Sequence, residues 1–232
     1  MVFSACDLFC SDNANFLVSD SFRDHVVSPA RLLLRLPEPM LARPGAIPTD
    51  PGWRYEPKLD GFRCLVCTHG RFRARSRRGW DMTPLLPELA DAVPADVQLD
   101  GELIALDADG NPDFHRLCKR MLHRHPGVSV TYMVFDVLVF DGEPTTGEPY
   151  RERRQLLEAL KLEPPHAGVL PTFTNGETLF EAVVEHGLEG VVAKRERDRY
   201  RPGERLWVKT KNRATPRFAE ETAGAARVRL RG

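Results

Sequence analysis

The most informative stretch of this chain is EPKLDGFR, residues 56–63. It places Lys58 between the carboxylates of Glu56 and Asp60, and Arg63 follows after a glycine. A lysine amine is a nucleophile only when it is deprotonated, and its ordinary pKa is about 10.4. Nearby positive charge and partial burial lower the pKa of a lysine, so Lys58 is a candidate nucleophile. The alternative is a surface lysine in a charged turn.

Two other side chains of this stretch have the chemistry to bind a nucleoside. Glu56 lies two positions before Lys58, on the same face of an extended strand. Its carboxylate can accept a hydrogen bond from a base amino group. Arg63 is a rigid fork of N–H donors, which suits ribose or phosphate oxygens.

A run of arginines follows at residues 71–79, RFRARSRRG. Arginines at every second position share one face of a strand. A solvated charged face explains most of them, and a stripe of phosphate contacts is the functional alternative. We expect SRRG at 76–79, with Arg77, to reach a ligand.

Two carboxylates each precede or follow a glycine beside an apolar run, in LDGELIA at 99–105 and LEGVVAK at 188–194. A strand carboxylate among Leu and Ile is costly unless it is paired or bound to metal. Glu102 and Glu189 are therefore candidate ligands for Mg²⁺ or Mn²⁺, whose other ligands are water and phosphate oxygens. Ordinary turn chemistry at the glycines is an equal alternative.

The remaining candidates lie on two later segments. Phe135, in the apolar run at 131–140, can stack on a purine, although simple core packing explains it nearly as well. Lys209 and Lys211 share one strand face and can neutralise charge on an α-phosphate. A pair of solvated lysines on an edge strand is their alternative.

The composition is that of an ordinary soluble chain. Its 232 residues suit one large domain or two small ones, and a formal net charge of zero neither supports nor excludes a nucleic-acid partner. No apolar run is long enough to span a membrane. Asp7, Asp12 and Asp20 interrupt the apolar core that a secretory signal needs, so we expect a cytoplasmic protein.

Five unevenly spaced cysteines do not predict a disulfide framework. Cys64 and Cys67 have the C-x-x-C spacing of zinc ligands. The segment reads as a strand, however, and residues three apart on a strand face opposite sides. We favour two buried thiols.

Hydrophobic periodicity and turn signals predict an α+β fold with two mostly antiparallel sheets flanked by helices. The expected strands are 53–58, 62–68, 71–77, 97–100, 102–107, 131–140, 190–194 and 205–210, and the expected helices are 83–93, 113–122, 151–161 and 177–186. We expect residues 1–31 to form an irregular extension, residues 32–213 the folded domain, and residues 214–232 a loosely ordered tail.

Taken in order, these segments resemble the nucleotidyltransferase motifs of ATP-dependent DNA ligases, with the greatest similarity to bacterial ones and to the ligase domain of end-joining ligases. The resemblance covers about residues 32–211. The segments are KLDGFR at 58–63, SRRG at 76–79, DGE at 100–102, FD at 135–136, EGVVAK at 189–194 and WVKTK at 207–211, and YRPGER at 200–205 resembles the segment before the last motif.

The resemblance implies a two-sheet domain with ATP in the cleft between the sheets. Lys58 would attack the α-phosphate and form a lysine–AMP intermediate, which passes AMP to a DNA 5′-phosphate before a 3′-hydroxyl displaces it. The implied roles are Asp60 for positioning Lys58 or a metal-bound water, Glu56, Arg63 and Arg77 for binding the nucleotide, Phe135 for adenine stacking, Glu102 and Glu189 for the metal, and Lys194, Lys209 and Lys211 for phosphates.

One departure bears on partners. In this family a small OB-fold domain follows the last lysine motif, and residues 212–232 are too few for a five-stranded barrel. We therefore expect a monomer that acts on nicked or broken DNA with a separate OB-fold protein, a polymerase or an end-binding protein. The alternatives are an RNA ligase or capping-type nucleotidyltransferase, and a truncated non-catalytic protein that binds a nucleotide or DNA. Lys58 argues against the last, because binding needs no nucleophile.

Overall fold

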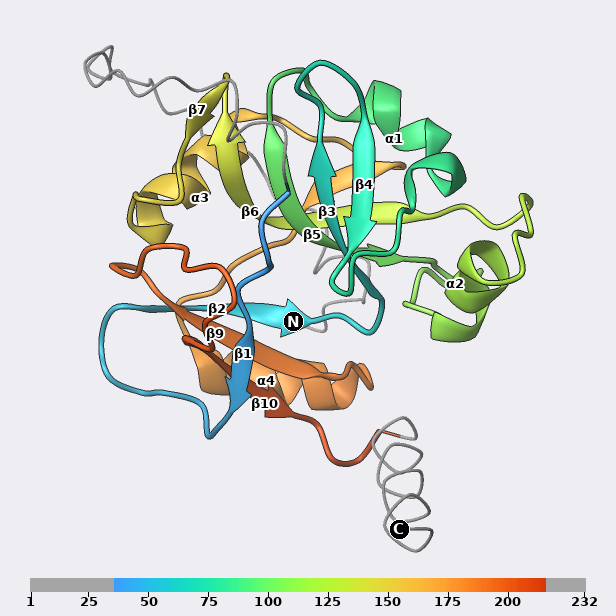
Figure 1. The fold of residues 1–232 in the computed structure, drawn as a ribbon. Coiled ribbons are helices and arrows are strands. Elements are labelled where there is room, and N and C mark those ends of the chain that lie inside the picture. The colour runs from blue at the N-terminus through green and yellow to red at the C-terminus, as the bar shows by residue number, and fades with distance from the viewer. Residues whose placement is uncertain (1–35, 216–232) are drawn as a thin grey trace, which may run out of the picture.

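The computed structural model describes residues 36–215, which form two sheets with an apolar cluster between them (Figure 1). The smaller sheet has the strand order β1 (Ala42–Pro44), β10 (Trp207–Lys211), β9 (Gly190–Arg195) and β2 (Trp53–Lys58). β1 pairs with β10 in parallel, and the other pairs are antiparallel. Helix α4 (Gly176–Glu185) packs against β2 and β9.

The larger sheet carries the other three helices at its margins (Figure 1). These are α1 (Pro87–Ala92), α2 (Phe114–Met121) and α3 (Tyr150–Ala159). The strand order is β4 (Arg73–Ser76), β3 (Phe62–Cys67), β5 (Gln98–Ile104), β6 (Thr131–Phe140) and β7 (Glu143–Pro144), with β8 (Ala167–Val169) parallel to β6. The predicted fold class is therefore confirmed.

The two faces of the smaller sheet follow directly from strand periodicity. Tyr55, Val191 and Val208 pack with α4 in one apolar cluster. Because successive side chains on a strand point to opposite faces, the residues between them face the larger sheet. Among those residues are the candidates Glu56, Lys58, Lys194, Lys209 and Lys211.

Apolar packing fixes the two sheets against each other. Leu65, Phe135 and Leu138 of the larger sheet share a buried cluster with Trp207 of the smaller one and with Met40. β6 is therefore apolar on both faces: Phe135 and Leu138 line the interface between the sheets, and Val134 and Val137 belong to the core on the other side of the larger sheet. Phe135 and Trp207 of this cluster also line the cleft that contains the polar candidate residues.

The structure differs from the predicted elements in two segments and in three short strands. Residues 97–107 do not form two strands, because β5 runs through Gly101 with a register irregularity at Asp100/Gly101. The expected helix 83–93 is a short 3-10 helix at Thr83–Leu85 followed by α1. Pro87 lacks the N–H that would continue the first turn, so the helix breaks there. The sequence reading also missed β1, β7 and β8.

The expected extension at residues 1–31 lies outside the described residues, as do residues 216–232 of the expected tail. Over residues 36–215, none of the helices combines the length and the apolar character needed to cross a membrane. Within the same residues, Cys64 and Cys67 are fully buried thiols that form no disulfide, as predicted.

Candidate active site

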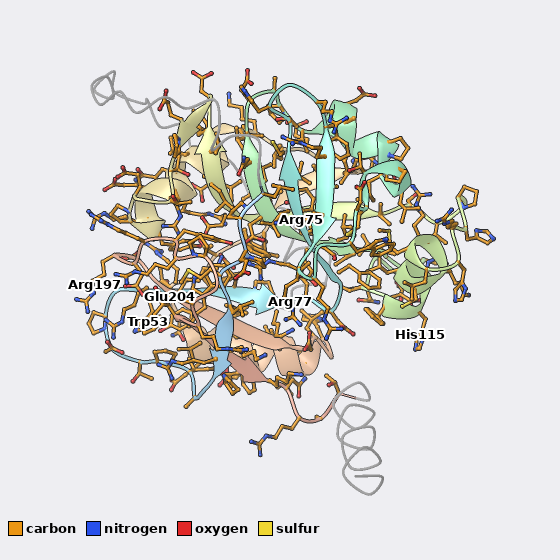
Figure 2. The ribbon with its side chains drawn as sticks, in the orientation of Figure 1. Trp53, Arg75, Arg77, His115, Arg197 and Glu204 are labelled. Carbon is orange, nitrogen blue, oxygen red and sulfur yellow. The ribbon has the colours of Figure 1, made fainter. Side chains whose placement is uncertain are left out.

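A cleft of about 600 Å³ lies between the two sheets. Every site residue predicted from the sequence lines it, and Figure 2 labels one of them, Arg77. β2, β9 and β10 contribute one wall, and β3, β5, β6 and the turn after β4 contribute the other. The predicted residues in this lining are Glu56, Lys58, Asp60, Arg63, Arg77, Glu102, Phe135, Glu189, Lys194, Lys209 and Lys211.

Lys58 is the last residue of β2, and its amine is held by one carboxylate. Its Nζ donates a hydrogen bond to Oε2 of Glu189, whose Oε1 lies 3.4 Å from Nζ of Lys211. Lys58 pairs in register with Gly190, which places Glu189 at this end of the strand. An ammonium in an ion pair is not a nucleophile, so attack by Lys58 requires this pair to open.

Gly190 makes the approach of the strands possible. Its φ is +154°, and a Cβ at this position would lie 2.2 Å from the carbonyl oxygen of Thr210. The glycine after Glu189 therefore serves close packing of β9 against β10. A Cβ on Gly61, after Asp60, would likewise lie 2.1 Å from the carbonyl oxygen of Leu103. At both positions the backbone of a neighbouring strand lies too close for any side chain, so the motif requires glycine there.

We expect Gly190→Ala to destabilise the fold by about 1–3 kcal/mol, because the added methyl group forces β9 away from β10. Glu189 would move with the backbone, so covalent nucleotide labelling of Lys58 should fall as well. Gly147→Ala is the matched control, since nothing lies within 4 Å of its added Cβ. Equal melting temperatures for the two variants would contradict this account.

The phosphate-binding candidates form a positive wall beside Lys58. Lys209 and Lys211 alternate along β10 and both line the cleft. Burial, followed by the charges of Lys58 and Lys211, lowers the pKa of Lys209. Neighbouring ammonium groups repel one another, and a bound anion reduces this repulsion. A chain of phosphates is therefore a ligand that suits these lysines.

Two residues before Lys58 on β2, the carboxylate of Glu56 is held by a partner on each of its oxygens. Its Oε1 accepts a hydrogen bond from the Tyr150 hydroxyl at 2.7 Å, and its Oε2 lies 2.9 Å from Nζ of Lys194. Lys194 also donates to the carbonyl oxygen of Phe135 at 2.9 Å. The carboxylate is 2% exposed and is held as an acceptor. Because Lys194 is paired here, its contact with a phosphate stays a prediction.

Arg63 and Phe135 meet in the same region. The guanidinium donates through Nε and one terminal nitrogen to the two oxygens of Asp100, both at 2.5 Å, and lies 4.5 Å from the centre of the Phe135 ring. The Tyr200 hydroxyl donates to Asp100 at 2.6 Å. Phe135 is 7% exposed, so its stacking on a purine stays a prediction.

Glu102 is the carboxylate that fits a metal ion best. It is half-buried in β5, and its side chain makes no hydrogen bond or ion pair within the part of the chain that the structure describes. Burial raises its pKa to about 7, against the opposing charges of Arg63 and Lys58. With Glu189 it offers hard oxygen ligands on one cleft. Mg²⁺ prefers one or two carboxylates plus phosphate oxygens, so the donor set fits this ion.

This pKa predicts a pH-dependent cost of keeping Glu102 charged. Between pH 4.5 and about 7 the unfolded carboxyl is ionised while the folded one stays protonated, so wild-type stability falls as the pH rises through this window. Gln cannot titrate. In the presence of EDTA, Glu102→Gln should raise the melting temperature more at pH 8 than at pH 5. If the difference in melting temperature between Glu102→Gln and the wild type were the same at pH 5 and pH 8, the raised pKa of Glu102 would be contradicted.

Sequence reasoning missed the residues that hold the site residues in place. Tyr150 fixes Glu56, Asp100 fixes Arg63, and Tyr200 joins Asp100 to the backbone N–H of Met40 at 2.8 Å. Tyr200 is the first residue of the YRPGER segment, which the family resemblance includes. Tyr150 has no comparable local signal, because only the folded chain brings α3 against β2.

A cleft with a lysine nucleophile candidate, acidic metal-ligand candidates and a wall of lysines defines a nucleotidyltransferase domain. Residues 39–211 match the family model described as the ATP dependent DNA ligase domain. The chain belongs to this family.

Curated relatives support the assignment. The chain is 40% identical over 187 residues to the multifunctional non-homologous end joining protein LigD of Mycobacterium bovis, which covers 75% of this chain and 24% of LigD. It is 32% identical over 168 residues to the SPbeta prophage-derived DNA ligase-like protein LigB of Bacillus subtilis, covering 70% of this chain and 62% of LigB. The chain thus spans about a quarter of the length of its LigD relatives.

A solved structure shows the same architecture. Mycobacterial DNA ligase D complexed with ATP and MES superposes with a TM-score of 0.65 at 37% identity, covering 76% of this chain and 60% of that chain. The ligase domain of LigD from M. tuberculosis gives the same TM-score and identity, with 75% and 59% covered.

Proposed function

We propose that this chain performs the adenylation step of an ATP-dependent DNA ligase. The observation that carries the proposal is the position of Lys58, whose Nζ lies on the Glu189 carboxylate in a cleft that also contains Lys209 and Lys211. A lysine that only bound phosphate would not need to be placed among carboxylates. An amine that attacks phosphorus needs the nucleotide aligned beside it.

In this reaction the deprotonated Nζ of Lys58 forms a bond to the α-phosphorus of ATP, and the bond to the bridging oxygen breaks. Pyrophosphate leaves with the electron pair, and the proton of the amine passes to solvent. Lys209 and Lys211 neutralise the charge that develops on the phosphates. Glu102 and Glu189 would hold Mg²⁺ or Mn²⁺, which supplies Lewis-acid stabilisation of the same oxygens.

Glu56 supports ATP as the donor over GTP. With Tyr150 and Lys194 on its two oxygens, the carboxylate remains an acceptor and favours the amino group of adenine. Guanine presents a carbonyl oxygen at the corresponding position, and two acceptors repel. This feature favours ligation chemistry over capping chemistry.

We propose nicked or broken DNA as the recipient of AMP, because the relatives are named as end-joining and DNA ligase proteins. A DNA 5′-phosphate oxygen would attack the lysine–AMP phosphorus, the P–N bond would break, and the amine of Lys58 would leave with a proton from solvent. A 3′-hydroxyl would then lose its proton and attack the DNA 5′-phosphorus, and AMP would leave with the electron pair of the broken P–O bond. We further propose that the chain works in the cytoplasm on DNA of the nucleoid. Its partner there would be an OB-fold protein, a polymerase or an end-binding protein.

The proposal is tested by supplying α-labelled ATP or GTP with Mg²⁺ to the purified chain. We expect covalent label from ATP and at least about tenfold less from GTP, because one mispaired polar group costs at least about 1.4 kcal/mol. Sealing of nicked DNA is then compared with sealing of nicked RNA. Preferential labelling by GTP would indicate capping chemistry, and preferential sealing of RNA would indicate an RNA ligase.

A further inference from the structure

The mouth of the cleft contains an exposed tryptophan. Four large apolar side chains of the described residues are exposed, namely Trp80, Leu106, Leu122 and Val184. Of these, Trp80 alone lines the cleft, and it is 40% exposed. An exposed indole beside a nucleotide-binding cleft loses apolar hydration when a flat ligand covers it.

Trp80 is held by a tight turn after β4. The N–H of Gly79 donates to the carbonyl oxygen of Ser76 at 3.0 Å, and the backbone N–H of Trp80 donates to the Ser76 hydroxyl at 3.0 Å. The N–H of Ser76 donates back to the carbonyl oxygen of Trp80 at 2.9 Å. These bonds fix the backbone of Trp80 beside the cleft before any ligand arrives.

The indole packs against a neighbouring aromatic ring. Trp80 meets the Phe62 ring in an edge arrangement, with centroids 6.4 Å apart and planes at 75°. Phe62 in turn packs on Phe114 at 5.6 Å. The indole is therefore anchored by an aromatic ring, while Trp80 stays 40% exposed.

The same turn presents two cations. Arg77 and Arg78 are exposed, line the cleft, and form no ion pair with any residue between 36 and 215. Figure 2 labels Arg77 at the base of the larger sheet, where it faces the smaller one. A fixed aromatic ring flanked by unpaired arginines is the arrangement with which proteins bind single nucleotides of a nucleic-acid strand.

We propose that Trp80 is a stacking platform for a nucleobase next to the break in DNA, with Arg77 and Arg78 on the adjoining backbone phosphates. The inference rests on the proposed function for its substrate class. The base of ATP is assigned to other residues of the lining, namely Glu56 and Phe135, so Trp80 is left for a second base. A base at a break is tethered to the backbone on one side only, so it leaves the stack at a lower cost than a base inside an intact strand.

The test measures coupling between the indole and the base. Affinity is measured by fluorescence anisotropy on a nicked duplex without ATP, with a normal base or an abasic residue at either the 5′-phosphate or the 3′-hydroxyl side of the nick. The proteins are the wild type, Trp80→Ala, Trp80→Phe and the control Leu122→Ala. Thermal melts confirm that each variant folds, and wild-type self-adenylation is measured separately.

We expect Trp80→Ala to weaken binding at least about fivefold, Trp80→Phe to retain most of the affinity, and Leu122→Ala to match the wild type. On one of the two abasic duplexes, the difference between wild type and Trp80→Ala should disappear, and the position identifies which base is stacked. An equal loss on both abasic duplexes, or no loss on any duplex, would overturn the proposal. Failure of self-adenylation with coupling intact would contradict the proposed function and leave this subsite standing.

Discussion

Lys58→Arg abolishes covalent labelling by ATP, with a loss of at least about a thousandfold relative to the wild type. Arginine keeps the positive charge that pairs with Glu189, so the ion pair and the local packing survive. A guanidinium stays protonated in proteins and cannot attack phosphorus. The variant therefore separates loss of the nucleophile from loss of the charge, which Lys58→Ala does not.

The measurement is radiolabel from α-labelled ATP that remains on the protein after denaturing electrophoresis. Lys161→Arg is the matched control, because Lys161 is exposed and does not line the cleft. It should label like the wild type. Substantial label on Lys58→Arg would mean that another side chain receives the nucleotide, and the assignment of Lys58 would be wrong.

The second large effect concerns stability. Asp136 follows Phe135 in β6 and is buried with Arg153 of α3, whose Nε and one terminal nitrogen donate to its carboxylate at 2.7 and 2.9 Å. The remaining terminal nitrogen donates to the carbonyl oxygens of Glu148 and Asp198. Removal of the carboxylate alone leaves a buried, uncompensated guanidinium.

We expect Asp136→Ala to lower the free energy of unfolding by about 3–5 kcal/mol. That is a large part of the roughly 5–15 kcal/mol that stabilises an ordinary domain. The measurement is denaturant unfolding followed by circular dichroism. The double variant Asp136→Ala/Arg153→Met should recover part of this loss, because it removes the unpaired charge as well.

Glu158→Gln measures how much stability the loss of a surface ion pair costs in the same helix. Glu158 is exposed and pairs with Arg154 one turn away, so its loss should cost less than about 1 kcal/mol. If Asp136→Ala cost no more than Glu158→Gln, the buried pair would not hold α3 against the larger sheet. A double variant less stable than the single one would also contradict the argument from an unpaired charge.

The sequence could predict the parts of this molecule that depend on local pattern. The strand at 53–58 and the helix over 177–186 follow from alternation and from turn signals, and the structure has them as β2 and α4 within one residue. The candidate site residues came from the order of short segments. Strand periodicity then placed Glu56 with Lys58, and Lys209 with Lys211, on one face of their strands, and both pairs line the cleft.

The rest depended on contacts between distant residues. β8 is three residues long and exists because it pairs with β6, so propensity gives no signal for it. The partners of the site residues, such as Tyr150 on Glu56, join positions 94 residues apart. Pro87 is a signal for a helix break that the sequence does contain. Thr83 and Pro84 are also a favourable helix start, and this second signal predicts one continuous helix from residue 83.

The most direct test of the central claim is to map the attachment site of the nucleotide. The wild-type chain is incubated with ATP and Mg²⁺, digested with a protease, and its peptides are sequenced by mass spectrometry. The account predicts AMP joined to the side-chain nitrogen of Lys58 and to no other residue. AMP on a different lysine, or a chain that carries no AMP although it is folded and binds ATP, would contradict it.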